Sequence, residues 1–111
     1  MSILNFLFKN KYQDQIKSVD ASDFKKLLKD KKSHLIDVRT PSEFRSNKIK
    51  GAKNINFHSR NFMDEIDKLD RNKPVMVYCK SGFRSRRSAK KLAKLGFTEI
   101  YDLKGGIMSW H

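Results

Sequence analysis

Short apolar runs alternate with amphipathic stretches along most of this chain. Five runs are short and rich in apolar or β-branched residues, and they predict strands. They span residues 16–19, 34–38, 52–57, 74–78 and 99–103, the third with the mixed pattern of an edge strand. The segments between them repeat their apolar positions at helical spacing. This alternation predicts an α/β fold with a mainly parallel central sheet and helices on both faces.

Local capping signals place the ends of the predicted helices. Asp20 precedes the apolar positions Phe24, Leu27 and Leu28, as an N-cap should. Residues 40–43 read Thr-Pro-Ser-Glu, a capping box with proline at the first helical position. A third helix is expected over the apolar positions of residues 62–69, and a fourth after residue 82, with Gly96 at its C-terminal end.

The single cysteine, Cys79, stands between the predicted strand 74–78 and the fourth predicted helix. The loop after it is polar, with Gly82 able to adopt a positive φ and with the hydroxyls of Ser81 and Ser85 as donors. Loop amides and the helix dipole would then point toward the thiol and favour a thiolate in an open site. A buried cysteine acting only as a small hydrophobe is the alternative interpretation. The loop favours a nucleophile.

Length and composition indicate one domain, which we place at residues 16–111, after an N-terminal extension of residues 1–15. The apolar run 3–8 is too short to span a membrane. Its positive charges follow it, whereas in a signal peptide they come first. We therefore expect a cytoplasmic monomer without membrane association, whose extension is packed or frayed. A short amphipathic helix of the extension on a membrane surface is the alternative.

Neither a disulfide nor a metal site is expected from one cysteine and the separated His34, His58 and His111.

The net charge is +13, from 25 Lys and Arg against 12 Asp and Glu. The basic residues are spread along the chain and match no specific nucleic-acid motif. One concentration follows Cys79 and would attract small anions or an acidic partner surface. It consists of Lys80, Arg84, Arg86, Arg87, Lys90, Lys91 and Lys94.

Three segments of the chain carry recognisable motifs. They are residues 36–44, continued by motif residues up to 55, then 78–85 around the cysteine, and 103–110 at the C-terminal end. Together, and in this order, they resemble the rhodanese family. The resemblance extends from about residue 16 to Trp110 and implies a three-layer rhodanese-like fold. Residues 48–52 read Lys-Ile-Lys-Gly-Ala, where the family often has His-Ile-Pro-Gly-Ala.

The resemblance implies sulfur transfer without a cofactor. The Cys79 thiolate would take the outer sulfur of thiosulfate, or of another persulfide or polysulfide, and pass it to a thiol, a sulfur-acceptor protein or cyanide. The persulfide formed on Cys79 would be held by a substrate-binding loop. That loop is formed by Lys80, Ser81, Gly82, Phe83, Arg84 and Ser85.

Three residues of the first motif are expected to support this site. Arg39 and Glu43 are four positions apart across a helix start and are expected to pair with each other. Asp37 ends a predicted strand and is expected to bind loop amides or Arg side chains. Gly105 and Gly106 predict a turn, and Trp110 a core anchor.

Two other functions are compatible with parts of this pattern. A phosphatase or arsenate reductase of the same fold also uses a thiolate in an anion-binding loop. Phosphatase loops place five residues between cysteine and arginine, whereas four separate Cys79 from Arg84. A sulfur-relay or regulatory protein-binding module would use the basic surface for docking.

Overall fold

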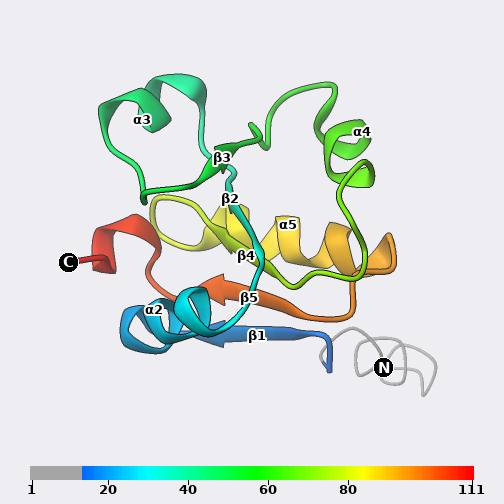
Figure 1. The fold of residues 1–111 in the computed structure, drawn as a ribbon. Coiled ribbons are helices and arrows are strands. Elements are labelled where there is room, and N and C mark those ends of the chain that lie inside the picture. Colours follow the sequence, from blue (N-terminus) through cyan, green and yellow to red (C-terminus); the bar gives the residue numbers. More distant parts are fainter. Residues whose placement is uncertain (1–13) are drawn as a thin grey trace, which may run out of the picture.

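The computed structural model describes residues 14–111, and the expectations for the apolar run 3–8 lie outside the described residues (Figure 1). Strands and helices alternate from the first described element to the last. The elements are β1 (Ile16–Val19), α2 (Ala21–Asp30), β2 (His34–Asp37), α3 (Pro41–Ser46), β3 (Lys53–Asn54), α4 (Phe62–Asp67), β4 (Val75–Tyr78), α5 (Phe83–Lys94), β5 (Ile100–Leu103) and the 3₁₀ helix η1 (Gly106–Ser109).

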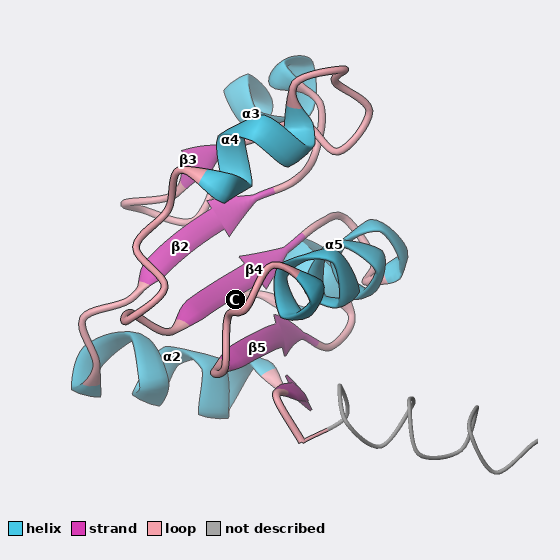
Figure 2. Ribbon diagram, turned by 90° about the vertical axis from the view of Figure 1, so that its right-hand side faces the viewer, coloured by secondary structure: helices cyan, strands magenta, loops and turns pink. Residues whose placement is uncertain are grey.

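The strands form one sheet in the order β1-β5-β4-β2-β3, and every neighbouring pair is parallel. Figure 2 shows the arrowheads of β2, β4 and β5 pointing the same way. The carboxyl ends of these strands therefore lie along one edge of the sheet, where ligands bind in open parallel sheets. This arrangement confirms the predicted α/β fold.

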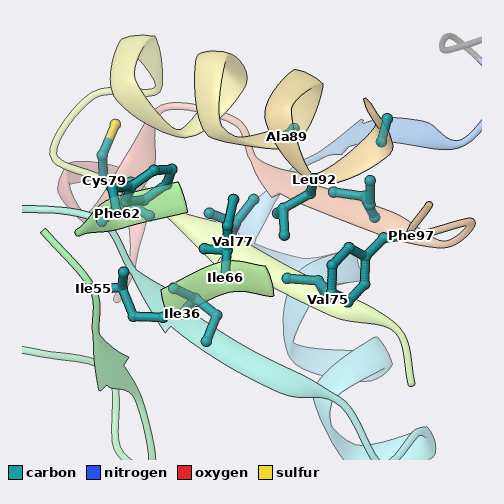
Figure 3. Packing of buried hydrophobic residues seen from close by; sticks show 13 residues of the cluster. Ile36, Ile55, Phe62, Ile66, Val75, Val77, Cys79, Ala89, Leu92 and Phe97 are labelled. Atoms are coloured by element: carbon teal, nitrogen blue, oxygen red, sulfur yellow. The ribbon is translucent and has the colours of Figure 1, made fainter. Parts of the chain in front are cut away.

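Strand β4 is buried on both faces and separates the two halves of the core. Val75 and Val77 point into a cluster with residues of α4 and α5, part of which is shown in Figure 3. Met76 and Tyr78 point the other way, into a cluster with Phe24 of α2. Helices consequently cover both faces, as the alternation of strands and helices predicts.

The predicted capping signals are present in the folded chain. The Asp20 carboxylate accepts a hydrogen bond of 2.9 Å from the Asp23 amide at the start of α2. Both reciprocal hydrogen bonds of the Thr40–Glu43 capping box form at the start of α3. These contacts satisfy amide groups that have no partner within the helix.

Two predicted elements are shorter than the sequence suggested. The expected strand 52–57 forms a regular strand only over Lys53–Asn54 at the sheet edge, although the Ile55 and Phe57 amides still donate to the Asp37 and Val38 carbonyls. Helix α4 ends at Asp67, so Leu69 packs on the core from the turn that follows. Within residues 14–111, no helix has the length and apolar character required to cross a bilayer.

Candidate active site

Cys79 lies directly after β4, at the carboxyl edge of the sheet and below the loop that enters α5 (Figure 3). Its Sγ accepts hydrogen bonds from the backbone N–H groups of Gly82, at 3.1 Å, and Ser85, at 3.4 Å. The side chain is only 1% exposed, so the expectation of an open thiol is wrong. The loop folds back over the sulfur to bring its amides within reach, and this closure excludes solvent.

Gly82 has the backbone conformation that the sequence predicted. Its φ is +112°, in the left-handed region that glycine adopts without strain. A Cβ at this position would also lie 2.8 Å from a guanidinium nitrogen of Arg86. The turn that directs the Gly82 amide at the sulfur therefore depends on glycine.

The C-terminal 3₁₀ helix supports the loop from the other side. The Ile107 amide donates to the Cys79 carbonyl at 2.8 Å, and the Met108 amide donates to the Lys80 carbonyl at 3.2 Å. A Cβ on Gly106 would lie 2.3 Å from the Lys80 oxygen. The sequence predicted a turn at Gly106, but it did not predict this contact with the cysteine loop.

A buried carboxylate, absent from the predicted site, lies next to the cysteine. The Ser85 hydroxyl hydrogen-bonds to Asp102 Oδ1, and Ser85 Oγ is 3.5 Å from Cys79 Sγ. Asp102 is fully buried, and its pKa is raised to about 6 by burial, against the opposing effects of the Ser85 hydrogen bond and the Arg86 charge. A charged residue inside the apolar run 99–103 was the available sequence signal.

Arg39 and Glu43 do not pair with each other as expected. The Arg39 guanidinium binds the Asp37 carboxylate at 2.7 Å and the Asn47 carbonyl at 2.5 Å. The predicted contact of Asp37 with an Arg side chain is thus present. Arg39 turns back toward its own strand because the buried Asp37 carboxylate needs a partner.

Glu43 instead joins α3 to the cysteine loop. Its two carboxylate oxygens accept hydrogen bonds of 2.7 and 3.0 Å from the Arg84 guanidinium. The Arg84 hydrogen bonds lower the pKa of Glu43 to about 2, despite partial burial. The Arg84 side chain, predicted to bind substrate, is therefore occupied by an intramolecular partner.

The surface beside the loop contains a pocket of about 260 Å³. The exposed side chain of Lys80 contributes to this pocket. Phe83, which does not line the pocket, is 59% exposed, and the Arg87 guanidinium carbon lies 5.0 Å from the centroid of its ring. Ser81 is exposed, and the amide donors to Cys79 come from Gly82 and Ser85. The pocket is lined by Arg39, Glu43, Ser46, Asn47, Lys80, Ile107 and Met108.

The remaining predicted site features lie further from the sulfur. Lys90, Lys91 and Lys94 extend the positive surface along α5, away from the loop. Trp110 packs edge-on against Phe24 with ring centroids 5.9 Å apart, which agrees with its predicted anchoring role. In residues 14–111, no group of three His, Cys, Asp or Glu side chains is arranged to hold a metal ion.

Comparison with known proteins defines the family. The rhodanese-like domain profile matches residues 20–111. An uncharacterised Bacillus subtilis protein, YqhL, is 40% identical over 89% of this chain and 76% of its own length. The chain belongs to the rhodanese-like domain family, as the three motifs predicted.

Other relatives agree on the fold and carry different names. The thiosulfate sulfurtransferase GlpE of Vibrio cholerae is 28% identical over 88% of this chain and 91% of its own. A tRNA uridine(34) hydroxylase of Pelagibacter ubique is 34% identical over 96% of this chain, which spans only 35% of that protein. A crystal structure of a rhodanese-related protein from Thermoplasma volcanium is 32% identical, with a TM-score of 0.74 over 85% of this chain and 89% of its own.

Proposed function

We propose that this protein is a sulfurtransferase that carries sulfane sulfur as a persulfide on Cys79. The observation that carries the proposal is the pair of backbone amides, from Gly82 and Ser85, directed at Sγ. Fixed N–H donors in a water-poor site stabilise negative charge on sulfur without having to reorganise. That is the requirement for a thiolate nucleophile and for an anionic persulfide.

The reaction would proceed in two displacement steps. The Cys79 thiolate attacks the outer sulfur of thiosulfate and forms a new S–S bond, while the bond to the inner sulfur breaks and sulfite leaves with its electron pair. An acceptor thiolate, or cyanide in an assay, then attacks the terminal sulfur of the persulfide. This second step returns Cys79 to the thiolate form.

Two observations favour sulfur transfer over phosphate chemistry. Relatives that match about nine-tenths of this chain are named thiosulfate sulfurtransferase. The Arg84 guanidinium is bound by Glu43, so binding of a tetrahedral oxyanion by Arg84 would require this ion pair to break. Robust hydrolysis of an aryl phosphate by the purified protein would favour the phosphatase alternative.

The direct test is mass spectrometry of the intact protein after exposure to thiosulfate. We expect one added sulfur atom on Cys79, which cyanide removes with release of thiocyanate. The matched control is Cys79→Ala, a substitution by another small residue at a buried position. Sulfur transfer at the wild-type rate in this variant would contradict the proposal, because Cys79 is the only thiol.

The exposed apolar side chains beside the loop favour a protein as the physiological sulfur acceptor. Phe83 is 59% exposed and Met108 is 65% exposed, and both adjoin the elements that enclose Cys79. We expect Phe83→Ser to slow transfer to a protein acceptor more than it slows transfer to cyanide. An equal loss with both acceptors would argue against docking through Phe83.

A further inference from the structure

The fully buried Asp102 carboxylate is connected to Cys79 through one hydroxyl group. Ser85 Oγ lies between them, 3.5 Å from Sγ and hydrogen-bonded to Asp102 Oδ1. The other carboxylate oxygen, Oδ2, is buried and has no hydrogen-bond partner among residues 14–111. An anionic carboxylate in this position has fewer hydrogen bonds and less opposite charge than buried charges usually have to offset their loss of solvent.

The groups around Asp102 leave its charge largely uncompensated. The neighbouring strands place Ser18 of β1 and Val77 of β4 in register with it, and neither side chain is charged. Helix α5 contributes Ser85 and the cation Arg86, whose charge lowers the pKa of Asp102 but does not offset burial.

Near Cys79 itself, the charge of Arg84 is countered by Glu43. Two adjacent anions, a Cys79 thiolate and an Asp102 carboxylate, would therefore repel each other in a site that is closed to solvent. In such a low-dielectric site this repulsion is worth several-fold more than at the same distance in water.

Ser85 has a single hydroxyl proton and more than one acceptor. Its Oγ is also 3.2 Å from the Gly82 carbonyl, so the proton that it donates to Asp102 can be redirected. When Asp102 is protonated, it can donate to Ser85 Oγ, and the Ser85 proton is then available to the sulfur. The direction of hydrogen-bond donation between Cys79, Ser85 and Asp102 can therefore reverse without any movement of the backbone.

We propose that Asp102 is a positioning residue that shares one negative charge with Cys79 through Ser85. In the transfer, the Cys79 S–H proton passes to Ser85 Oγ while the Ser85 proton passes to Asp102 Oδ1. Cys79 becomes a thiolate, Ser85 remains a neutral hydroxyl and Asp102 becomes a neutral acid, so the total charge is unchanged. This role rests on the proposed function, for which the thiolate is the attacking species.

Charge sharing makes the thiolate available without bringing a second anion into the buried site. It also predicts a coupled titration of the Cys79 thiol and the Asp102 carboxyl. Each of the two deprotonation steps then involves both groups and cannot be assigned to one of them. The thiolate fraction would rise partly as the pair loses its first proton and would reach completion only when the second proton leaves.

The test is the ultraviolet absorbance of the thiolate as a function of pH in the full chain, with the Cys79→Ser variant as the baseline. We expect two steps in the wild type and one step in Asp102→Asn. The midpoint of that single step should lie about one to two pH units below the upper wild-type step, because the adjacent negative charge is absent. The matched control Glu99→Gln changes a carboxylate that directly precedes β5 and pairs with Lys31, and it should keep two steps.

A single wild-type step, or an Asp102→Asn curve that coincides with the wild-type curve, would overturn the proposal. A purely structural role for Asp102 would lower stability and leave the shape of the titration unchanged. These readouts involve no sulfur donor. Failure of charge sharing is therefore distinguishable from failure of sulfur transfer, which the persulfide measurement detects.

A second measurement covers the case in which Asp102→Asn does not fold. The Asp102 carboxyl carbon is followed by NMR against pH in the wild type and in Cys79→Ala. Coupling between two sites is reciprocal, so the wild-type carboxyl should titrate in two phases and the variant carboxyl in one. Identical curves in the two proteins would overturn the proposal.

Discussion

The two fully buried aspartates of the sheet have opposite electrostatic surroundings. Asp37 of β2 and Asp102 of β5 lie on the two strands that flank β4, and both are 0% exposed. Asp37 accepts hydrogen bonds from the Arg39 amide, at 2.9 Å, and from its guanidinium, at 2.7 Å. In the described part of the chain, the Asp102 carboxylate hydrogen-bonds to the Ser85 hydroxyl through one oxygen, and its second oxygen has no partner.

The difference shows that the partner, rather than burial itself, determines what a buried carboxylate does. Burial lowers the pKa of Arg39, but the hydrogen bonds and charge of Asp37 outweigh it and raise that pKa. This ion pair fixes the start of the segment that leads to α3. Within residues 14–111, Asp102 has no such cation in hydrogen-bond contact, and burial raises its pKa to about 6.

Removing the cation from the buried Asp37–Arg39 ion pair should have the largest effect on stability. Arg39→Ala leaves the Asp37 carboxylate buried without its partner, which we expect to cost about 3–5 kcal/mol in the free energy of unfolding. Urea denaturation at neutral pH measures the loss. The matched control is Arg45→Ala, an exposed arginine of α3, for which we expect a change within about 0.5 kcal/mol. A loss below about 1 kcal/mol in Arg39→Ala would mean that Asp37 does not need this ion pair.

Removing the charge from the uncompensated aspartate should change how stability depends on pH. The pKa of Asp102 in the folded protein is about 6, above its ordinary value of 3.8. The folded state therefore holds the proton more tightly, and stability falls as pH rises through this interval. Asp102→Asn should abolish this pH-dependent decrease, which we expect to amount to about 2–3 kcal/mol in the free energy of unfolding.

The comparison is best made in the Cys79→Ala background, where the carboxyl group titrates without its thiol neighbour. Urea denaturation at several pH values gives the free energy of unfolding with and without Asp102→Asn. The difference between the two proteins should change by the stated amount between about pH 3.5 and pH 7. Parallel curves across that range would show that Asp102 ionises as easily in the folded protein as in the unfolded chain.

The same contrast explains which features the sequence could predict. Four of the five strands, the caps at Asp20 and Thr40, and the left-handed Gly82 depend on neighbouring residues and were predicted correctly. The links from Ser85 to Asp102 and from Arg84 to Glu43 join residues 17 and 41 positions apart. Such contacts can be predicted only when the strand order and the helix packing are known. The expected Arg39–Glu43 pair is absent because Arg39 binds Asp37, two positions away, whereas Glu43 binds the distant Arg84.

The smallest expected effect concerns Glu43 and Arg84, a pair that is charged like Asp37 and Arg39 but partly exposed. The two side chains are 28% and 18% exposed, so solvent and salt screen their attraction. Glu43→Gln keeps a side chain suited to the capping box and removes only the charge. We expect a loss of about 1 kcal/mol at neutral pH, measured by urea denaturation at low salt.

The pH dependence of this pair should be opposite in sign to that of Asp102. The pKa of Glu43 is lowered in the folded protein from 4.5 to about 2. Its contribution is therefore fully present above about pH 4.5 and is lost as pH falls toward 2. The difference between wild type and Glu43→Gln should shrink in acid, and should also shrink at high salt. A difference that persists under both conditions would mean that the glutamate acts through packing or the capping box, and that its charge contributes little.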